Sequence, residues 1–538
     1  MGLSIATVMS SGIAGRSDDP ARLRTAFWTV WALLLAIKIA LASTLAPFGD
    51  EAWYWQESRN LDWAFSDLPP ATAVLIRFGE LVLGHGVLAM RAPFLLLGAL
   101  VPLVLVRTSA RLFGARTGWF TGMLALAMPL LGTLGMSALP DVPLTLCAAL
   151  ALDLLEHAVR TKCLRDWGLL GLALAGAWLS HYRAAMLLLA GLGFLLLTAR
   201  GRALWTYRGL WLAIAISLLG LVPLVIFNET HGWVALGFQL VERNPWSFHA
   251  DGLLQPIEQA IVCTPLFYML LLWTTWACAR RAREGAPWDV LAICSAVPIV
   301  AWFALGCFAD DTRLRLHWPL QGYLPLLIAV PPLLAANVAG VRAWRRAAMM
   351  ATLALLASGC ALTLAYFAAA AVPGGAVSLA QFKAFPEHWV GWSESAAQAD
   401  RLLELPQFGN ATLVADNFML AAELDFAFDG TRPVYALDHP INTKHGRAPQ
   451  LALWQRDETA LAVLGPRPLL VAVEPTARRE RERAAWLTQV CARLDAPKLV
   501  DHLELYAGRK RYLFLGAGGL VAGRHSVAAT GDDCAAIR

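Results

Sequence analysis

The feature that most constrains this chain is a series of apolar runs, each long enough, or nearly so, to cross a lipid bilayer. A bilayer core about 30 Å thick needs roughly 20 apolar residues in a helix. Eleven such runs lie near residues 26–46, 88–106, 117–136, 142–159, 167–180, 184–199, 209–227, 257–278, 287–305, 317–335 and 347–371. The runs at 167–180 and 184–199 are short for full spans. We therefore expect a polytopic α-helical membrane protein with about eleven spans.

Composition supports this expectation and excludes a soluble enzyme. The chain is 58% hydrophobic and 15% charged, whereas a soluble domain is roughly 45–50% apolar and about 25% charged. A net charge of +5 over 538 residues is too small to indicate a nucleic-acid partner.

The positions of Lys and Arg predict the orientation in the membrane. Alternate loops carry 18 of these residues in six sets of three, starting with Arg16, Arg22 and Arg24, whereas the opposite loops and span ends carry 7. Positive charge stays on the cytoplasmic side, so the loops that carry the 18 Lys and Arg residues are expected in the cytoplasm. An odd number of spans then places residues 372–538 outside, which is the periplasm of a Gram-negative cell. The run at 26–46 has no cleavage site after it and is interpreted as an uncleaved first helix of the inner (plasma) membrane.

Composition divides the chain into a transmembrane part, 1–371, and a soluble part, 372–538. The second part has no 18-residue apolar run and contains short β-like stretches separated by charged helix-like segments such as 478–494. This pattern predicts a small periplasmic α/β domain. Its cysteines, Cys491 and Cys534, could pair, but their spacing is not diagnostic. The β-like stretches are 411–415, 433–437, 469–473, 499–506 and 512–515.

The first outside loop, residues 47–87, is too long to be a simple connector. Asp50 and Glu51 stand directly after the first span, among several Trp and Tyr residues. Residues 50–60 and 71–83 are expected as short helices on the membrane face, with the turn between them fixed by Pro69-Pro70. A carboxylate at this place could deprotonate an acceptor hydroxyl. It could equally cap the 50–60 helix, since negative charge is favourable at a helix N-terminus.

Further outside residues are candidates for the same chemistry. Asp141 stands in a tight loop, either as a second cavity carboxylate or as the cap of the helix that carries Pro143. Arg183, Arg243, Arg315 and His317 are among the few basic groups expected outside. Arg binds phosphate through a rigid two-pronged fork, although a single such residue could instead pair or snorkel at the interface.

Lys38 is unusual because it lies near the middle of the first span. It could pair with a carboxylate across the bundle or line a polar cavity.

The order of these motifs resembles bacterial PMT-type (protein-mannosyltransferase-like) GT-C glycosyltransferases, a family related to the lipid A aminoarabinose transferases. The likeness spans nearly the whole chain, although Leu68 stands where this family commonly has a His. The motifs are Asp50-Glu-Ala-Trp-Tyr-Trp, Leu61-Asp-Trp63, Asp67-Leu-Pro-Pro70, Leu-Pro-Asp141-Val-Pro, Ser180-His-Tyr-Arg-Ala184, Asn228-Glu-Thr-His231-Gly-Trp233, Phe238-Gln239, His317-Trp-Pro319, Tyr323-Leu-Pro325, Ala415-Asp416, Pro433-Val-Tyr435 and Leu453-Trp454.

The resemblance implies a membrane glycosyltransferase that moves a hexosyl or pentosyl sugar from a polyprenyl-phosphate donor, such as an undecaprenyl-phosphate sugar. The acceptor would be an envelope glycolipid such as lipid A, a glycan or a protein, and the anomeric carbon would be inverted on the periplasmic face. A divalent metal is possible but is not indicated by any ligand cluster. The roles implied are catalytic for Asp50, Glu51 and Asp141, donor-phosphate binding for Arg183, Arg315 and His317, and substrate binding for Tyr54, Asp67, Tyr182, His231 and Trp318.

Two other classes remain as alternatives from the sequence. A transporter or flippase with a periplasmic cap would carry more charge within its spans and would often show an internal repeat. A non-catalytic envelope scaffold would be favoured by loss of the acidic pair, but Asp50 and Glu51 are both present.

Overall fold

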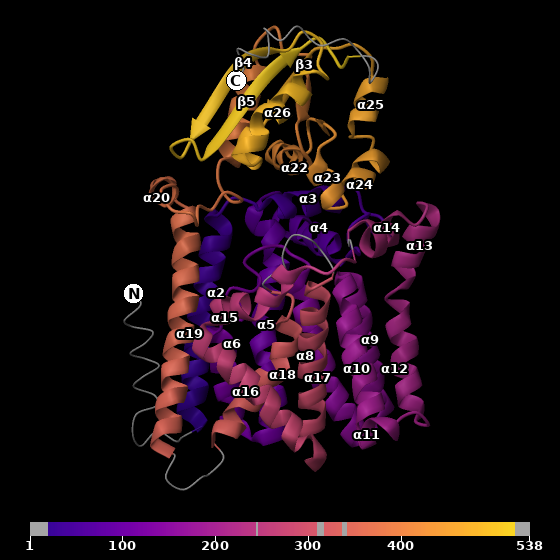
Figure 1. Cartoon of the computed structure of the whole chain (residues 1–538), viewed down its shortest axis with the longest axis vertical. Coiled ribbons are helices and arrows are strands. Elements are labelled where there is room, and N and C mark those ends of the chain that lie inside the picture. Colours follow the sequence, from indigo (N-terminus) through magenta and orange to yellow (C-terminus); the bar gives the residue numbers. More distant parts are fainter. Residues whose placement is uncertain (1–19, 244–245, 309–316, 336–341, 522–538) are drawn as a thin grey trace.

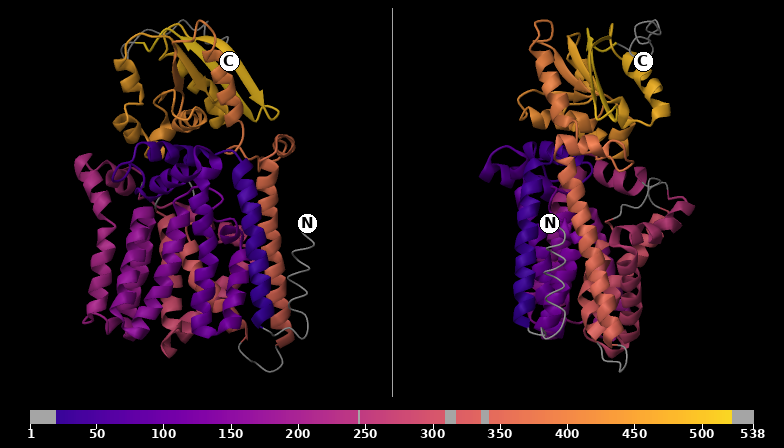
Figure 2. Two further views of the ribbon diagram at one scale, coloured as in Figure 1. Left: turned by 180° about the vertical axis from the view of Figure 1, so that it is seen from behind. Right: turned by 90° about the vertical axis from the view of Figure 1, so that its left-hand side faces the viewer.

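A computed structural model describes residues 20–243, 246–308, 317–335 and 342–521. Upright helices form a bundle, and a region containing a β-sheet, residues 372–521, covers one end of it (Figure 1). We call these parts the helical bundle and the C-terminal region. Views from behind and from the side show the same two layers (Figure 2). The short helix α11 (Ala199–Arg202), which contains Arg200 and Arg202, lies at the end of the bundle opposite the sheet.

Each predicted apolar run overlaps one helix or a broken pair of helices. In the described part of the chain, six helices are long and apolar enough to cross a membrane, or seven if the pair α15–α16, bent by 116°, is one span. The predicted number of eleven stays a prediction, because the other segments are shorter. The helices are α2 (Pro20–Thr44), α5 (Val87–Phe113), α6 (Ala115–Ala127) with α7 (Pro129–Gly132), α8 (Asp141–Thr161), α9 (Leu164–Ser180), η1 (Tyr182–Ala184) with α10 (Ala185–Leu197), α12 (Arg208–Leu219) with α13 (Val222–Thr230), α15 (Gln255–Cys263) with α16 (Pro265–Arg281), α17 (Trp288–Gly306), α18 (Leu320–Ala335) and α19 (Arg342–Ala370).

The third predicted run breaks between α6 and α7, because the residue before a proline avoids the helical conformation: Met128 is extended and Pro129 begins α7. After α7 the chain passes so close to α5 that a Cβ on Gly135 would lie 2.4 Å from the carbonyl oxygen of Phe94, and Gly135 has a φ of +92°. Only glycine adopts such a conformation at no steric cost. Lys38 reaches this segment, where its Nζ donates to the carbonyl of Leu134 at 2.8 Å. Among the residues that the structure describes, the hydrogen-bond partner of Lys38 is thus a backbone carbonyl and not a carboxylate.

The two short helices expected after the first span are present as α3 (Gly49–Arg59) and α4 (Ala71–Leu83). They lie across the end of the bundle, beneath the C-terminal region (Figure 1). The indoles of Trp53 and Trp55 on α3 are completely buried, and they contact Phe418 and Phe426 of the C-terminal region at ring-centroid distances of 5.4 and 5.3 Å. Aromatic residues therefore join the two parts.

The C-terminal region contains a five-stranded sheet in the order β2-β1-β3-β5-β4. Its strands are β1 (Thr412–Ala415), β2 (Val434–Ala436), β3 (Leu469–Val473), β4 (Lys498–Leu505) and β5 (Lys510–Ala517), and each overlaps a predicted β-like stretch. Strand β1 is parallel to β2 and β3, whereas β5 is antiparallel to β3 and β4. The helices of this region are α20 (Pro373–Leu379), α21 (Trp392–Leu403), α22 (Phe418–Ala427), α23 (Pro440–Lys444), α24 (Ala448–Leu453), α25 (Glu458–Val463), η5 (Pro475–Ala477) and α26 (Glu480–Cys491).

Side chains alternate between the two faces of the sheet, as the period of two requires. Val414 and Val471 pack with Trp486 of α26 on one face. Leu413 and Leu470 point the other way and belong to the same buried core as the helical bundle. The described core is therefore continuous from the bundle into one face of the sheet. Cys534, which was considered as a partner of Cys491, lies outside the described residues.

Candidate active site

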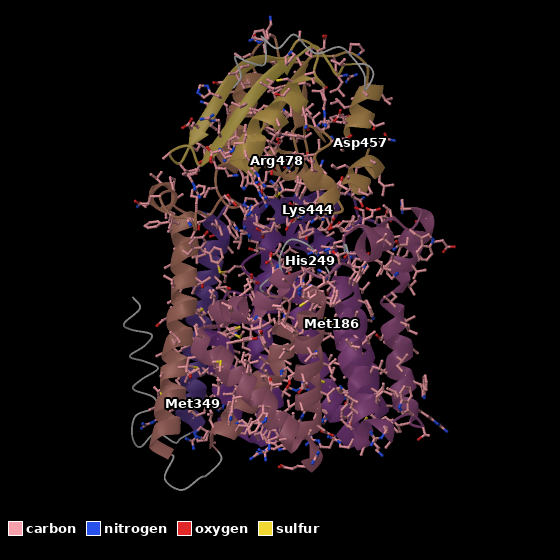
Figure 3. The ribbon with its side chains drawn as sticks, viewed as in Figure 1. Met186, His249, Met349, Lys444, Asp457 and Arg478 are labelled. Carbon is pink, nitrogen blue, oxygen red and sulfur yellow. The ribbon has the colours of Figure 1, made fainter. Side chains whose placement is uncertain are left out.

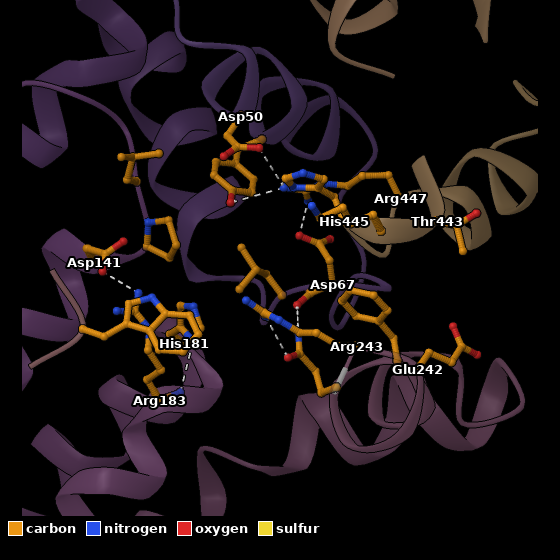
Figure 4. Close-up of a pocket in the computed structure, with 18 of the residues that line it drawn as sticks. Asp50, Asp67, Asp141, His181, Arg183, Glu242, Arg243, Thr443, His445 and Arg447 are labelled. Atoms are coloured by element: carbon orange, nitrogen blue, oxygen red, sulfur yellow. Dashed lines mark hydrogen bonds and ion pairs between the residues drawn. The ribbon is translucent and has the colours of Figure 1, made fainter. Parts of the chain in front are cut away.

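A cavity of about 520 Å³ lies between the end of the bundle and the C-terminal region. Acidic side chains of the bundle and basic side chains of both parts face it (Figure 4). Its lining is Phe48, Asp50, Tyr54, Asp67, Leu68, Leu139, Pro140, Asp141, His181, Arg183, Phe238, Gln239, Val241, Glu242, Arg243, His317, Trp318, Thr443, Lys444, His445 and Arg447. Thus the predicted site residues Asp50, Tyr54, Asp67, Asp141, Arg183, His317 and Trp318 come together around one space.

One wall of the cavity combines carboxylates of the first outside loop with an arginine of the C-terminal region. Arg447 donates to Asp67 in a short contact and to Asp50 at 3.3 Å. It also lies 3.4 Å from the hydroxyl of Tyr54 and 3.7 Å from the carboxylate of Glu57. We call Asp50, Tyr54, Glu57, Asp67 and Arg447 the acidic wall.

Burial changes the ionisation of this wall. It raises the pKa of Glu57 well above the ordinary value, and the neighbouring Asp67 raises it further. Burial also raises the pKa of Asp67 and of Tyr54. Burial alone would lower the pKa of Arg447, but Asp67, Tyr54, Asp50 and Glu57 together raise it above its ordinary value. Arg447 thus remains charged while Glu57 favours its neutral form.

The opposite wall is basic and is formed entirely by the bundle. Arg183, next to α9 in η1, makes a short ion pair with Asp141 at the start of α8. His317 lies 3.2 Å from the same carboxylate oxygen through its Nε2. Asp141 is the first residue of α8, after the N-cap Pro140, and its carboxylate also orients two basic groups. We call Asp141, Arg183 and His317 the basic wall.

An aromatic and a second arginine extend the basic wall. The guanidinium groups of Arg183 and Arg243 lie 5.6 and 5.5 Å from the ring centre of Trp318. Arg243 follows the π-helix η2 (Phe238–Glu242) and donates to Gln239 at 3.2 Å, and Gln239 in turn donates to the carbonyl of Asp67 at 2.7 Å. Arg243 therefore connects the basic wall to the acidic wall.

Glu51 lies apart from the cavity and is fully buried against Arg91 of α5. Its two oxygens accept from Arg91 Nε at 2.8 Å and from Nη2 at 2.6 Å. They also accept from the backbone N–H of Phe48 at 2.9 Å and of Ala138 at 2.6 Å. The capping interpretation thus describes Glu51, whereas Asp50, its neighbour on α3, faces the cavity.

Tyr182 and His231, predicted to bind substrate, do not line the cavity. Tyr182 packs against the buried cluster that contains Ala64 and Phe227. The ring of His231 stacks on Phe227 with a centroid distance of 4.4 Å, because the chain turns back after α13. Arg315, predicted to bind phosphate, lies outside the described residues.

Sequence reasoning did not find several cavity residues. Lys444, His445 and Arg447 follow β2, in a polar stretch where only the closely spaced basic residues offered a signal. Lys444 lies at the level where the C-terminal region meets the bundle (Figure 3). His181 also lines the cavity, and burial and the neighbouring Arg183 lower its pKa well below the ordinary value. It therefore stays neutral beside the basic wall.

No group of three or more His, Cys, Asp or Glu residues in the described ranges could hold a metal ion. The cavity instead places carboxylates opposite guanidinium and imidazole groups. Such an arrangement can remove a proton from a hydroxyl at one wall and stabilise a developing negative charge at the other.

Comparisons with known proteins point to the same chemistry. Residues 67–227 match the family model described as dolichyl-phosphate-mannose-protein mannosyltransferase. The chain is 24% identical over 404 residues to the lipid A galacturonosyltransferase RgtD of Rhizobium johnstonii, an alignment that covers 72% of this chain and 79% of that relative.

Solved structures show a similar fold. The structure of ArnT from Cupriavidus metallidurans bound to undecaprenyl phosphate has a TM-score of 0.63 at 17% identity, covering 93% of this chain and 98% of that one. Its apo form has a TM-score of 0.64 at 16% identity, covering 92% and 98%. These comparisons support a membrane glycosyltransferase that is similar to the PMT-type enzymes and to a lipid A transferase in sequence, and to ArnT in fold.

Proposed function

We propose that this enzyme transfers a sugar from a polyprenyl-phosphate donor to a hydroxyl of a lipid A-type glycolipid on the periplasmic face of the inner membrane. The observation that carries the proposal is the cavity in which Asp50 on one wall faces the Asp141-Arg183-His317 cluster on the other. Similarity to RgtD, a lipid A galacturonosyltransferase, supports the acceptor class. The ArnT structure with undecaprenyl phosphate supports the donor class.

The proposed reaction is a single displacement. Asp50 accepts the proton of the acceptor hydroxyl while that oxygen bonds to the anomeric carbon of the sugar. The bond between this carbon and the phosphate oxygen breaks from the opposite side, and the bonding electrons leave with the phosphate. The products are the glycosylated acceptor, with inverted configuration, and polyprenyl phosphate.

The basic wall provides the partners for the leaving phosphate. Arg183 is buried and is held by Asp141, so its guanidinium is oriented before the donor binds. Fixed donors aimed at developing charge lower the barrier because they need no reorganisation during the reaction. His317 and Arg243 add positive or hydrogen-bonding groups to the same wall.

An apolar cavity of about 270 Å³ lies within the bundle. Two of its lining residues are close in sequence to residues of the basic wall. Leu187 lines it four residues after Arg183, and Gln321 lines it four residues after His317. We propose that isoprenoid units next to the phosphate bind in this cavity. Its other lining residues come mainly from α8, α9, α10, α12, α17 and α18 and are mostly Leu and Ala.

Orientation and domain roles follow from the same proposal. The cavity and the C-terminal region share one end of the bundle, and the arginine-bearing α11 lies at the other. Because positive charge stays on the cytoplasmic side, the end that carries the cavity faces the periplasm. We propose that residues 1–371 form the transmembrane part, which binds the donor, and that residues 372–538 help to select the acceptor.

The test compares membranes that contain the wild type, Asp50→Asn or Asp62→Asn in a deletion strain, by mass spectrometry of lipid A, lipopolysaccharide and envelope proteins. Asp62 is an exposed aspartate of the same loop, so it controls for the substitution itself. Expression must be equal in all three strains. The expected result is a pentose, hexose or uronic acid mass increase on lipid A with the wild type and Asp62→Asn only.

A full increase with Asp50→Asn would exclude Asp50 as the base. An increase on protein or on another glycan, and not on lipid A, would overturn the proposed acceptor. Absence of any increase with the wild type would contradict the transfer reaction to these acceptors.

A further inference from the structure

The acidic wall contains three carboxyl groups and one arginine. Asp50, Glu57 and Asp67 carry three carboxyl groups, and Arg447 is the guanidinium that contacts all of them. The side chains of Glu57, Asp67 and Arg447 are 5% exposed or less, and that of Asp50 is 14% exposed. Since charges interact strongly when buried, the ionisation of the Asp50 carboxyl group depends on the charge of Arg447.

We propose that Arg447 is a positioning residue for Asp50, and that the C-terminal region thereby completes the catalytic centre of the bundle. This inference rests on the proposed function, in which Asp50 is the base. Arg447 holds the carboxylate of Asp50 toward the cavity and keeps it ionised. Glu57 and Asp67 hold the other side of the guanidinium.

Aromatic rings fix the position of Arg447. Its guanidinium carbon lies 5.0 Å from the ring centre of Trp53, 5.1 Å from that of Tyr54 and 5.5 Å from that of Phe418. Cation–π contacts of this kind are strongest where water is excluded. Two of the rings belong to α3 and one to α22, so the arginine is held from both parts of the protein.

The backbone next to Arg447 is also fixed by both parts. Gly446 has a φ of +72°, and a Cβ at this position would lie 2.6 Å from the ring of Phe238. The carbonyl of Gly446 accepts from the hydroxyl of Ser66 at 2.6 Å, and the N–H of Ser66 donates to Gln450 at 2.9 Å. Arg447 therefore enters the acidic wall on a turn that the first outside loop holds in place.

Loss of the positive charge should raise the pKa of Asp50, because an adjacent opposite charge favours the ionised form of a carboxyl group. The groups that face the acidic wall on other elements do not replace Arg447. Lys444 is exposed and belongs to the same turn, and Arg243 is linked to the acidic wall through Gln239, which donates to the backbone carbonyl of Asp67 and not to a carboxylate. The remaining titratable groups around this wall of the cavity are Glu242 and His445.

The test uses the full-length enzyme in proteoliposomes with a polyprenyl-phosphate sugar and measures kcat against pH for the wild type, Arg447→Lys and Arg447→Gln. The matched control is Arg481→Gln, because the side chain of Arg481 is 76% exposed on α26. In Arg447→Gln the acid limb of the kcat profile should move up by about 1–3 pH units. In Arg447→Lys the acid limb should stay near that of the wild type, because the positive charge is kept. Its kcat should fall by about 10²-fold, because the two-pronged guanidinium group that orients Asp50 is lost.

Binding of undecaprenyl phosphate, measured separately, should change by less than about threefold in both variants, since the basic wall is intact. An unchanged acid limb in a folded Arg447→Gln would overturn the proposal. If that variant does not fold, Arg447→Lys decides, and an unchanged kcat there would overturn it. Full activity of Asp50→Asn would instead refute the proposed base, which is a separate result.

Discussion

The buried pair Glu51–Arg91 allows a test that separates the structural role of Glu51 from the proposed catalytic role of Asp50. Both side chains are 0% exposed, and the pair is bidentate. Removal of one partner from such a pair typically costs about 3–5 kcal/mol, because the other charge is left buried without compensation. We therefore expect Glu51→Gln to lower the ratio of folded to unfolded protein by roughly 10² to 10⁴.

The arginine has further acceptors that limit relaxation after this change. Arg91 also donates to the carbonyls of Ala42, Leu45 and Ala46 at 3.0, 2.8 and 2.9 Å. It thereby fixes the end of α2 against α5 and the start of α3, which carries Asp50. In Glu51→Gln the arginine remains tied to these carbonyls and cannot reach water without breaking them.

The assay measures the melting temperature of the detergent-purified protein alongside turnover per folded molecule. Glu51→Gln should melt well below the wild type, with much of the turnover per folded molecule retained, and Asp50→Asn should show the opposite pattern. Replacement of both partners, as Glu51→Leu with Arg91→Met, should recover part of the lost stability, because apolar residues leave no unpaired charge. If Glu51→Gln melts like the wild type but loses turnover, the structural role assigned to Glu51 is refuted.

Three further predictions concern the basic wall, the turn before Arg447 and the sheet. Arg183→Ala should lower kcat/KM for the donor by about 10- to 100-fold, since hydrogen bonds to charged groups are worth about 1.5–3 kcal/mol; an unchanged kcat/KM in steady-state assays would contradict this. Gly446→Val should abolish most turnover, because a Cβ there meets Phe238 at 2.6 Å, whereas Gly409→Ala, at a glycine with open space around it, should not. Burial raises the pKa of Asp416 from 3.8 to about 7, so the folded state keeps a proton that the unfolded chain loses. Stability should therefore fall as the pH rises from about 4 to about 7. Asp416→Asn should flatten the dependence of melting temperature on pH.

Much of this architecture follows from local patterns that are visible in the sequence. Five β-like stretches become five strands because Val, Leu and Tyr alternate faces of a half-buried sheet. The apolar runs become helices, but several are broken, as at Met128 before Pro129. The close approach of the following segment to α5, which requires Gly135, depends on a neighbouring helix and cannot be predicted from an apolar run.

The candidate site was predictable where function needs charge in an apolar setting. Asp50, Asp141, Arg183 and His317 are conspicuous because the outer ends of membrane helices otherwise carry few charges. Their common lining of one cavity agrees with the expected placement. Glu51 could not be separated from Asp50 by sequence, because adjacent residues on a helix point about 100° apart and only the position of Arg91 decides which one is buried.

Arg447 shows why the remaining part of the site could not be read from the chain. It is about 400 residues from Asp50 and sits in a polar segment, where an arginine is ordinarily solvated. Its contacts with Asp50 and Tyr54 arise from the tertiary arrangement, which brings the segment after β2 onto α3. The basic wall is formed by the bundle alone, whereas the acidic wall is shared with the C-terminal region. Under the proposed function, changes in that region alter acceptor recognition while the basic wall keeps its geometry, but only if they preserve the turn that carries Arg447. On this proposal the C-terminal region is a constrained part of the candidate active site and not an interchangeable cap.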